Sequence, residues 1–135
     1  MLLRIVQNLV RNSIMHAQGD VTIKMWLEEE HAYICFQNPI DENIQLNPNQ
    51  LFDRFYTTDN SRRKNTGLGL SIVKLLTEKL GGNVAAKIEN GMIEFLVCLK
   101  KEFVIVAAKK LSASLYAPGY GELGSAYHLQ LRSFK

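Results

Sequence analysis

One stretch, residues 51–73, constrains this chain more than any other, and it reads LFDRFYTTDNSRRKNTGLGLSIV. It opens with an aromatic and arginine cluster, continues as a polar run containing Arg62, Arg63 and Lys64, and ends in two glycines before an apolar helical pattern. Glycines at a helix start let the backbone approach a ligand closely, and the free N–H groups there favour an anion such as phosphate. The basic run suits a flap that closes over a polyphosphate. The order differs from a P-loop and from a dinucleotide-binding GxGxxG, so the stretch predicts another type of phosphate site.

The rest of the pattern predicts an α+β fold. Two segments carry apolar residues at the helical period, and four shorter apolar runs are bounded by turn residues, as strands are. Gly81 and Gly82 are typical of a helix end, and Asn90 with Gly91 is typical of a two-residue hairpin turn. We therefore expect a two-layer α/β sandwich, with helices on one face of a mixed, mostly antiparallel sheet. The predicted elements are helices at 2–17 and 70–80, strands around 21–27, 33–36, 83–88 and 92–99, and a short helical turn at 51–56.

Composition narrows the class of protein. The chain has 135 residues, of which 47% are hydrophobic and 21% are charged, as expected of one globular domain. Its net charge of +3 is too small to indicate nucleic-acid binding. No apolar run approaches the roughly 20 residues of a membrane span, and no signal-peptide pattern opens the chain. Cys35 and Cys98 each lie in an apolar strand-like run without metal-ligand spacing, so we expect two buried, reduced thiols in a cytoplasmic protein.

Two asparagines on the first predicted helix suggest a metal site. Asn8 and Asn12 are four residues apart, so both amides project from one helical face. Amide oxygens are hard, neutral ligands that suit Mg²⁺ shared with substrate phosphates. Two solvent-exposed helix asparagines would show the same spacing, so the pair alone leaves both interpretations open.

With these parts in order, the chain resembles the ATP-binding catalytic domain of bacterial sensor histidine kinases, which are Bergerat-fold ATPases. The resemblance covers roughly residues 2–100. RIVQNLVRNSIMHA at 4–17 is similar to the family's N box, and LFDRFY is similar to its F box. TGLGLSIVK resembles the second glycine box, and ENGMIEFLVCL resembles the closing hairpin. The N box, the F box and the glycine box occur in the family's order, which makes an accidental similarity improbable.

The resemblance implies a domain that binds Mg-ATP and presents the γ-phosphate to a histidine on a separate domain. The implied partners are ATP or ADP, the dimerisation and phosphoacceptor domain of the same kinase, and a response regulator in the full system. It implies no nucleic acid and no membrane contact by this fragment, although a longer parent could be membrane-anchored. Asn8 and Arg54 are the implied catalytic residues, and Asn8 and Asn12 are the implied Mg²⁺ ligands. The implied nucleotide-binding residues are Asn8, Asn12, His16, Asn38, Arg54, Tyr56, Thr66, Gly67, Leu68, Gly69 and Leu70.

Arg54 has a physical rationale of its own. A guanidinium group between Phe52 and Phe55, which we expect to anchor the root of the flap in the core, could offer several N–H donors to the γ-phosphate. A surface salt bridge with Asp53 or Asp59 is the alternative.

One departure from the family concerns the nucleobase. The family usually carries Asp-x-Gly-x-Gly after its central strand, and that carboxylate accepts a hydrogen bond from the adenine amino group. Here the stretch reads Phe36-Gln37-Asn38-Pro39-Ile40, without aspartate or glycine. The amide oxygen of Asn38 could accept the same hydrogen bond, more weakly because it is uncharged. Asn38 could equally be a residue that ends a strand before proline.

The chain is expected to be a fragment. His16, His31 and His128 are not followed by the acidic residue of a phosphoacceptor motif, and the N-terminus lies inside the N box helix. We therefore expect the acceptor domain and a preceding strand to be missing, and no autophosphorylation by this chain alone. The catalytic domain is predicted at 1–102, and 103–135 is an extension of uncertain origin, either appended or a native binding segment. Residues 103–108 could add a strand.

Two other functions fit parts of the pattern. An anti-sigma-type protein serine kinase would share the fold, but the F box favours sensor kinases. A degenerate nucleotide-binding or interaction module is suggested by the altered adenine box.

Overall fold

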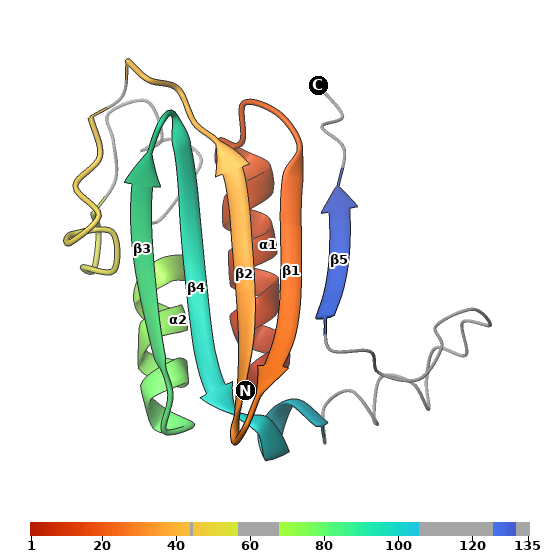
Figure 1. Ribbon diagram of the computed structural model, residues 1–135. Helices are drawn as coiled ribbons and strands as arrows, with labels where there is room; N and C mark the ends of the chain where they lie inside the picture. Colours follow the sequence, from red (N-terminus) through yellow and green to blue (C-terminus); the bar gives the residue numbers. More distant parts are fainter. Residues whose placement is uncertain (44, 57–67, 106–125, 132–135) are drawn as a thin grey trace.

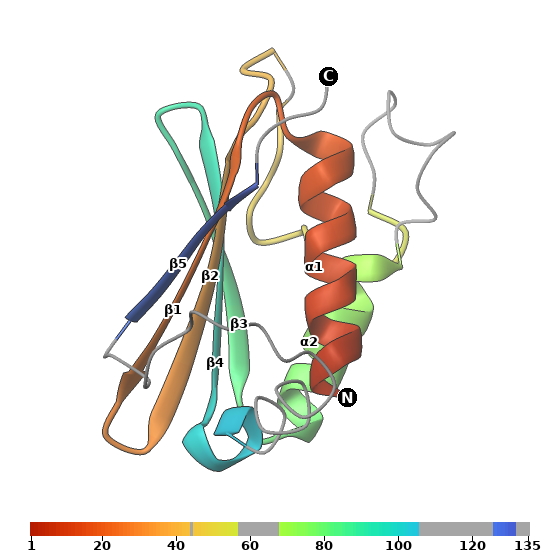
Figure 2. The same cartoon turned by 90° about the vertical axis from the view of Figure 1, so that its right-hand side faces the viewer.

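The computed structural model describes residues 1–43, 45–56, 68–105 and 126–131. Its sheet has the strand order β3-β4-β2-β1-β5, and every described pair of neighbours is antiparallel. Both helices cover one face of this sheet, which confirms the predicted α+β sandwich (Figures 1 and 2). The elements are α1 (Leu2–His16), β1 (Val21–Glu28), β2 (His31–Pro39), α2 (Gly69–Lys79), β3 (Asn83–Glu89), β4 (Met92–Lys100) and β5 (Ala126–Leu131).

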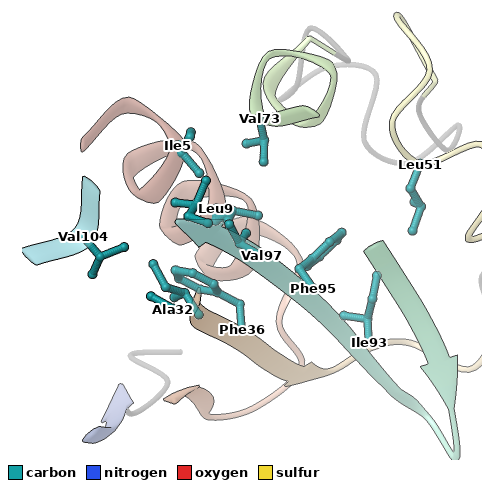
Figure 3. Close-up of a cluster of buried hydrophobic side chains, with 12 residues drawn as sticks. Ile5, Leu9, Ala32, Phe36, Leu51, Val73, Ile93, Phe95, Val97 and Val104 are labelled. Carbon is teal, nitrogen blue, oxygen red and sulfur yellow. The ribbon is translucent and has the colours of Figure 1, made fainter. Parts of the chain in front are cut away.

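The core lies between the helices and the sheet. Ile5 and Leu9 of α1 and Val73 of α2 are 0% exposed, and they point toward Phe36 and Phe95 of the central strands (Figure 3). The helical period places Ile5 and Leu9 one turn apart, while alternation along β2 and β4 sends every second side chain to the same face. Not every apolar residue of α1 faces the core, since Ile14 is 58% exposed.

Glycine ends α2 and closes the last hairpin as the sequence predicted. Gly81 has a φ of 77°, and its N–H donates to the Glu78 carbonyl oxygen at 2.9 Å. The N–H of Gly82 donates to the Thr77 carbonyl oxygen at 3.0 Å, which completes a Schellman motif. Asn90 and Gly91 have φ values of 52° and 73° between β3 and β4, as a two-residue hairpin turn requires.

Residues 51–56 correct two expectations. They form a series of hydrogen-bonded turns rather than a helical turn, with the Asp53 N–H donating to Gln50 and the Tyr56 N–H donating to Asp53. Phe52 does anchor the segment, because its ring packs edge-on against the ring of Phe95, with the two ring centroids 6.1 Å apart. Phe55 does not, because it is 66% exposed with a φ of 65°. A left-handed backbone at Phe55 turns the side chain out of the core.

The segment after β4 also differs from expectation. Residues 101–105 are helical, so the strand suggested at 103–108 is wrong for the residues that the structure describes there. A strand occurs instead at β5, which pairs with β1 in the register Ile23 to Leu129 and lies at the sheet edge in Figure 1. The sequence did not predict β5, because pairing along an edge far away in the chain leaves no local period. No helix in the described part of the chain is long and apolar enough to span a membrane.

Candidate functional site

Asn8 lies where the two helices meet. Its side-chain Nδ2 donates to the Arg4 carbonyl oxygen at 2.8 Å, which orients the amide and leaves Oδ1 directed away from α1. A Cβ placed on Gly69, the first residue of α2, would lie 3.4 Å from that oxygen. The structure therefore brings the predicted N box and the predicted glycine box together at one point.

Asn12 and His16 follow Asn8 along α1 at intervals of one turn, so the three side chains share one face of the helix. Asn12 and His16 are both half-buried. The core-facing stripe of Ile5 and Leu9 is adjacent to this face, and the amides consequently lie on the border between the core and the helix surface.

The N-terminus of α2 faces Asn8 from the other helix. Leu68 is the N-cap and has no side-chain cap, while its carbonyl oxygen accepts from the Ile72 N–H at 3.0 Å and the Ser71 hydroxyl at 2.8 Å. The first N–H groups of a helix have no intrahelical partner, and the helix dipole is positive at this end. Gly69 lies inside the helix, so it serves close approach to Asn8 rather than a left-handed φ. The other predicted residues of this region, Thr66, Gly67, Arg62, Arg63 and Lys64, lie outside the described residues.

Arg54 is exposed in the loop before α2. Its guanidinium carbon lies 5.6 Å from the centroid of the Phe55 ring, within the range of a cation–π contact. The neighbouring Tyr56 is tied to the loop, because its hydroxyl accepts from the Asn47 N–H at 3.1 Å. Arg54 thus precedes residues 57–67 closely in the sequence, and its side chain is exposed to solvent.

Asn38 is buried at the end of β2. It is 1% exposed, and its Nδ2 donates to the Pro39 carbonyl oxygen at 3.0 Å, while its Oδ1 has no partner in the described chain. The strand does not end at Asn38, since Asn38 pairs with Ile93 and Pro39 pairs with Met92. An inward-facing acceptor without a donor is the feature that a nucleobase amino group would satisfy.

Ser13 is a buried polar residue of this region that was not among the residues predicted for the site. It is 0% exposed, and its hydroxyl has no hydrogen-bond partner among the described residues. The signal that could have found it is a serine inside an otherwise apolar helical stripe.

The cysteines lie away from these residues. Cys35 alternates with Ile34 and Phe36 along β2 and therefore sits on the sheet face opposite the helices. Burial, followed by the nearby Glu94, raises the pKa of the Cys35 thiol to about 11. Cys35 is thus a neutral thiol near pH 7, and it is buried as expected. Cys98 is only half-buried, so the expectation of two buried thiols is wrong for Cys98.

Most of the chain matches a known protein family. The family model described as "Histidine kinase-, DNA gyrase B-, and HSP90-like ATPase" matches residues 1–103. The probable sensor protein PcoS of Escherichia coli is 34% identical over 104 residues, which cover 73% of this chain and 22% of PcoS. The phosphate regulon sensor protein PhoR of Pseudomonas aeruginosa is 39% identical over 75 residues, which cover 50% of this chain and 16% of PhoR. The chain spans less than a quarter of either relative.

Solved structures share the fold. A nucleotide-free catalytic domain of the histidine kinase ThkA has a TM-score of 0.56 and 26% identity, with coverage of 72% of this chain and 65% of that one. The mycobacterial sensor histidine kinase MprB has a TM-score of 0.60 and 21% identity, with coverage of 72% and 68%. The two structures support the arrangement of helices and sheet described above.

Proposed function

Because this chain belongs to the family of histidine kinase-, DNA gyrase B- and HSP90-like ATPases, we propose that it is the catalytic domain of a two-component sensor histidine kinase. Its proposed role is to bind Mg-ATP and donate the γ-phosphate to a histidine on the kinase's dimerisation and phosphoacceptor domain, from which a response regulator would receive it. The observation that carries the proposal is the approach of Asn8 Oδ1 to Gly69, because it joins the two motifs at one point. Relatives named as sensor kinases support it.

The phosphates would bind at the start of α2. The N–H groups of Gly69 and Leu70, which have no partner within the helix, suit an anion together with the positive end of the helix dipole. The first turn of α2 contains no acidic residue that would repel it. Thr66, Gly67 and Leu68 would extend the same backbone cradle.

The residues beside this cradle fit a magnesium ion. The Asn8 oxygen is oriented by the hydrogen bond from its own Nδ2 to Arg4, and Asn12 adds a second amide one turn later. Amide oxygens suit Mg²⁺ that keeps waters and phosphate oxygens as its other ligands. The described residues contain no cluster of three His, Cys, Asp or Glu side chains that could hold a metal elsewhere. When bound, Mg²⁺ would neutralise part of the polyphosphate charge.

Arg54 and the base-binding end complete the proposed site. Arg54, whose guanidinium group lies against the Phe55 ring, would donate to the γ-phosphate oxygens. The buried Asn38 Oδ1 would accept from the adenine amino group. His16 and Tyr56 are assigned to nucleotide contact from the family pattern. Catalysis of phosphoryl transfer is mostly positioning and charge stabilisation, so these groups would suffice once an acceptor histidine approaches.

Calorimetry tests the proposal directly. ATP and ADP should bind the chain weakly, and more tightly with Mg²⁺ than with a chelator present. Asn12→Ala should remove most of this Mg²⁺ dependence, whereas Gln7→Ala, which removes an exposed amide from the same helix, should leave it unchanged. Absence of binding at millimolar nucleotide would contradict the proposal and would favour an interaction module. Transfer of phosphate to serine, recognised by an acid-stable product, would favour the anti-sigma-type kinase.

A further inference from the structure

Two buried side-chain atoms in the described part of the chain have no hydrogen-bond partner, and these are the Ser13 hydroxyl and the Asn38 amide oxygen. Ser13 is 0% exposed and Asn38 is 1% exposed. An unpaired buried polar atom is costly enough that nearly all have a partner, so each is expected to find one outside the chain. The proposed function uses Asn38 and leaves the Ser13 hydroxyl unexplained.

Both residues lie at the same end of the layer between α1 and the sheet. Ser13 lies in the last turn of α1, and Asn38 is the penultimate residue of β2. The helix and this strand run in the same direction, so their ends meet at the top of Figure 1. The Gln18 N–H, just beyond α1, donates to the Pro39 carbonyl oxygen at 2.9 Å and ties the two ends together.

The Pro39 carbonyl decides how the Asn38 amide points. It accepts from Asn38 Nδ2 at 3.0 Å, and a reversed amide would place two oxygens against each other. The unpaired position of Asn38 is therefore an acceptor, its Oδ1, although an asparagine could present either polarity. The Ser13 hydroxyl can rotate and can either donate or accept.

On the basis of the proposed function, we propose that Ser13 is a second base-contacting residue. Its hydroxyl donates to the ring nitrogen N1 of adenine while Asn38 Oδ1 accepts from the neighbouring amino group. Pro39 is a positioning residue, because its carbonyl holds Asn38 in the acceptor orientation. Guanine would place its own carbonyl oxygen against Asn38 Oδ1, so the pair selects adenine over guanine by polarity.

Base-modified nucleotides test each contact separately. In 1-deaza-ATP a C–H group replaces N1, so the wild-type chain should bind it about fivefold more weakly than ATP, the effect of one neutral hydrogen bond. Ser13→Ala should weaken ATP binding by a similar factor and leave 1-deaza-ATP binding unchanged. Purine riboside triphosphate, which lacks the amino group, should lose the Asn38 contact and should still respond to Ser13→Ala.

Thr77→Val is the matched control. Thr77 is also a fully buried hydroxyl on a helix, but it donates to the Val73 carbonyl oxygen, so its removal should alter stability without changing the ratio of ATP to 1-deaza-ATP affinity. Equal affinity of the wild-type chain for ATP and 1-deaza-ATP would overturn the role of Ser13 while the proposed function stands. That measurement also decides the matter if Ser13→Ala fails to fold. Absence of any nucleotide binding would overturn both.

Discussion

Gly69 is the residue at which the two proposed nucleotide-binding motifs touch. A methyl group there would reach ordinary van der Waals distance from Asn8 Oδ1, 3.4 Å, and would cover the first N–H groups of α2. The fold tolerates such a group, whereas at Gly82 a Cβ would overlap the Cys98 carbonyl oxygen. Gly82 is therefore required by packing, whereas Gly69 is not, and we propose that Gly69 instead leaves room for a ligand.

We expect Gly69→Ala to lower Mg-ATP affinity at least fivefold, because the methyl group displaces phosphate from the helix end. Stability should be unchanged or slightly higher, since alanine favours helix over glycine. Gly81→Ala is the control, because its φ of 77° should cost about 1 kcal/mol of stability and leave affinity intact. Titration calorimetry and thermal melts measure both quantities. Unchanged affinity in Gly69→Ala would remove the phosphate from this position.

Asn38 gives a second prediction at this scale. Replacing it by the family's usual aspartate should not strengthen ATP binding here, because a carboxylate oxygen would face the Pro39 carbonyl oxygen without a donor. We expect Asn38→Asp to lose about 3 kcal/mol of stability at pH 7, since a buried, unpaired charge is costly.

The pH dependence of Asn38→Asp follows from the same contact. Burial should raise the folded-state pKa of the new carboxyl group above its unfolded value, so the folded state would hold the proton more tightly. The stability deficit relative to wild type should therefore shrink as the pH falls from 7 toward 4. Denaturant unfolding at several pH values measures this. A variant as stable as wild type throughout, with tighter ATP binding, would contradict the role assigned to Pro39.

At the scale of elements, the two edges of the sheet differ. The β3 edge follows α2 directly, whereas the β1 edge is paired by β5 from the far end of the chain. An unpaired strand edge exposes N–H and C=O groups that can pair with another molecule. We therefore propose that β5 has a structural role, which is to cover the edge of β1. All the proposed site residues lie within residues 1–103.

A chain truncated after residue 105 should test that role. We expect it to keep nucleotide affinity, melt at a lower temperature and associate in a concentration-dependent manner through β1. A truncation after residue 131, which retains β5, should behave as the full chain does. Size-exclusion chromatography and thermal melts over a concentration range measure these effects. A stable monomer after the first truncation would show that the β1 edge needs no cover.

At the scale of the whole molecule, His31 and the proposed base-binding residue Asn38 lie at opposite ends of β2. Asn38 marks the site end of β2, and His31 begins the same strand at the opposite end. At about 3.3 Å per residue the two are roughly 23 Å apart. Phosphoryl transfer needs close, in-line approach of the acceptor to the γ-phosphate, and a histidine held on the same rigid sheet is poorly placed to make that approach.

We therefore expect no histidine phosphorylation when the isolated chain is incubated with labelled ATP. An acceptor hairpin from the parent kinase, supplied separately, should be labelled slowly, because cutting the linker lowers its effective concentration. Acid-labile label on the isolated chain that disappears in His31→Ala would contradict this expectation.

Local chemistry made much of this protein predictable from its sequence. The α1 helix, the position of Asn8 and Asn12 one turn apart on it, the glycine stop after α2 and the Asn-Gly hairpin depend on neighbouring residues, and the structure has these elements where they were expected. The family pattern also located Asn38 at the end of the central strand, but not which way its amide points.

Only the tertiary structure decided the features that join distant segments. The approach of Gly69 to Asn8, the Pro39 carbonyl that orients Asn38, and the pairing of β5 with β1 each depend on how separate elements pack. The burial of Ser13 and the outward turn of Phe55 have the same origin. A period of 3.6 or 2 residues reports which face of an element is apolar, but the partner of that face is set by long-range packing, which leaves no mark on the local sequence.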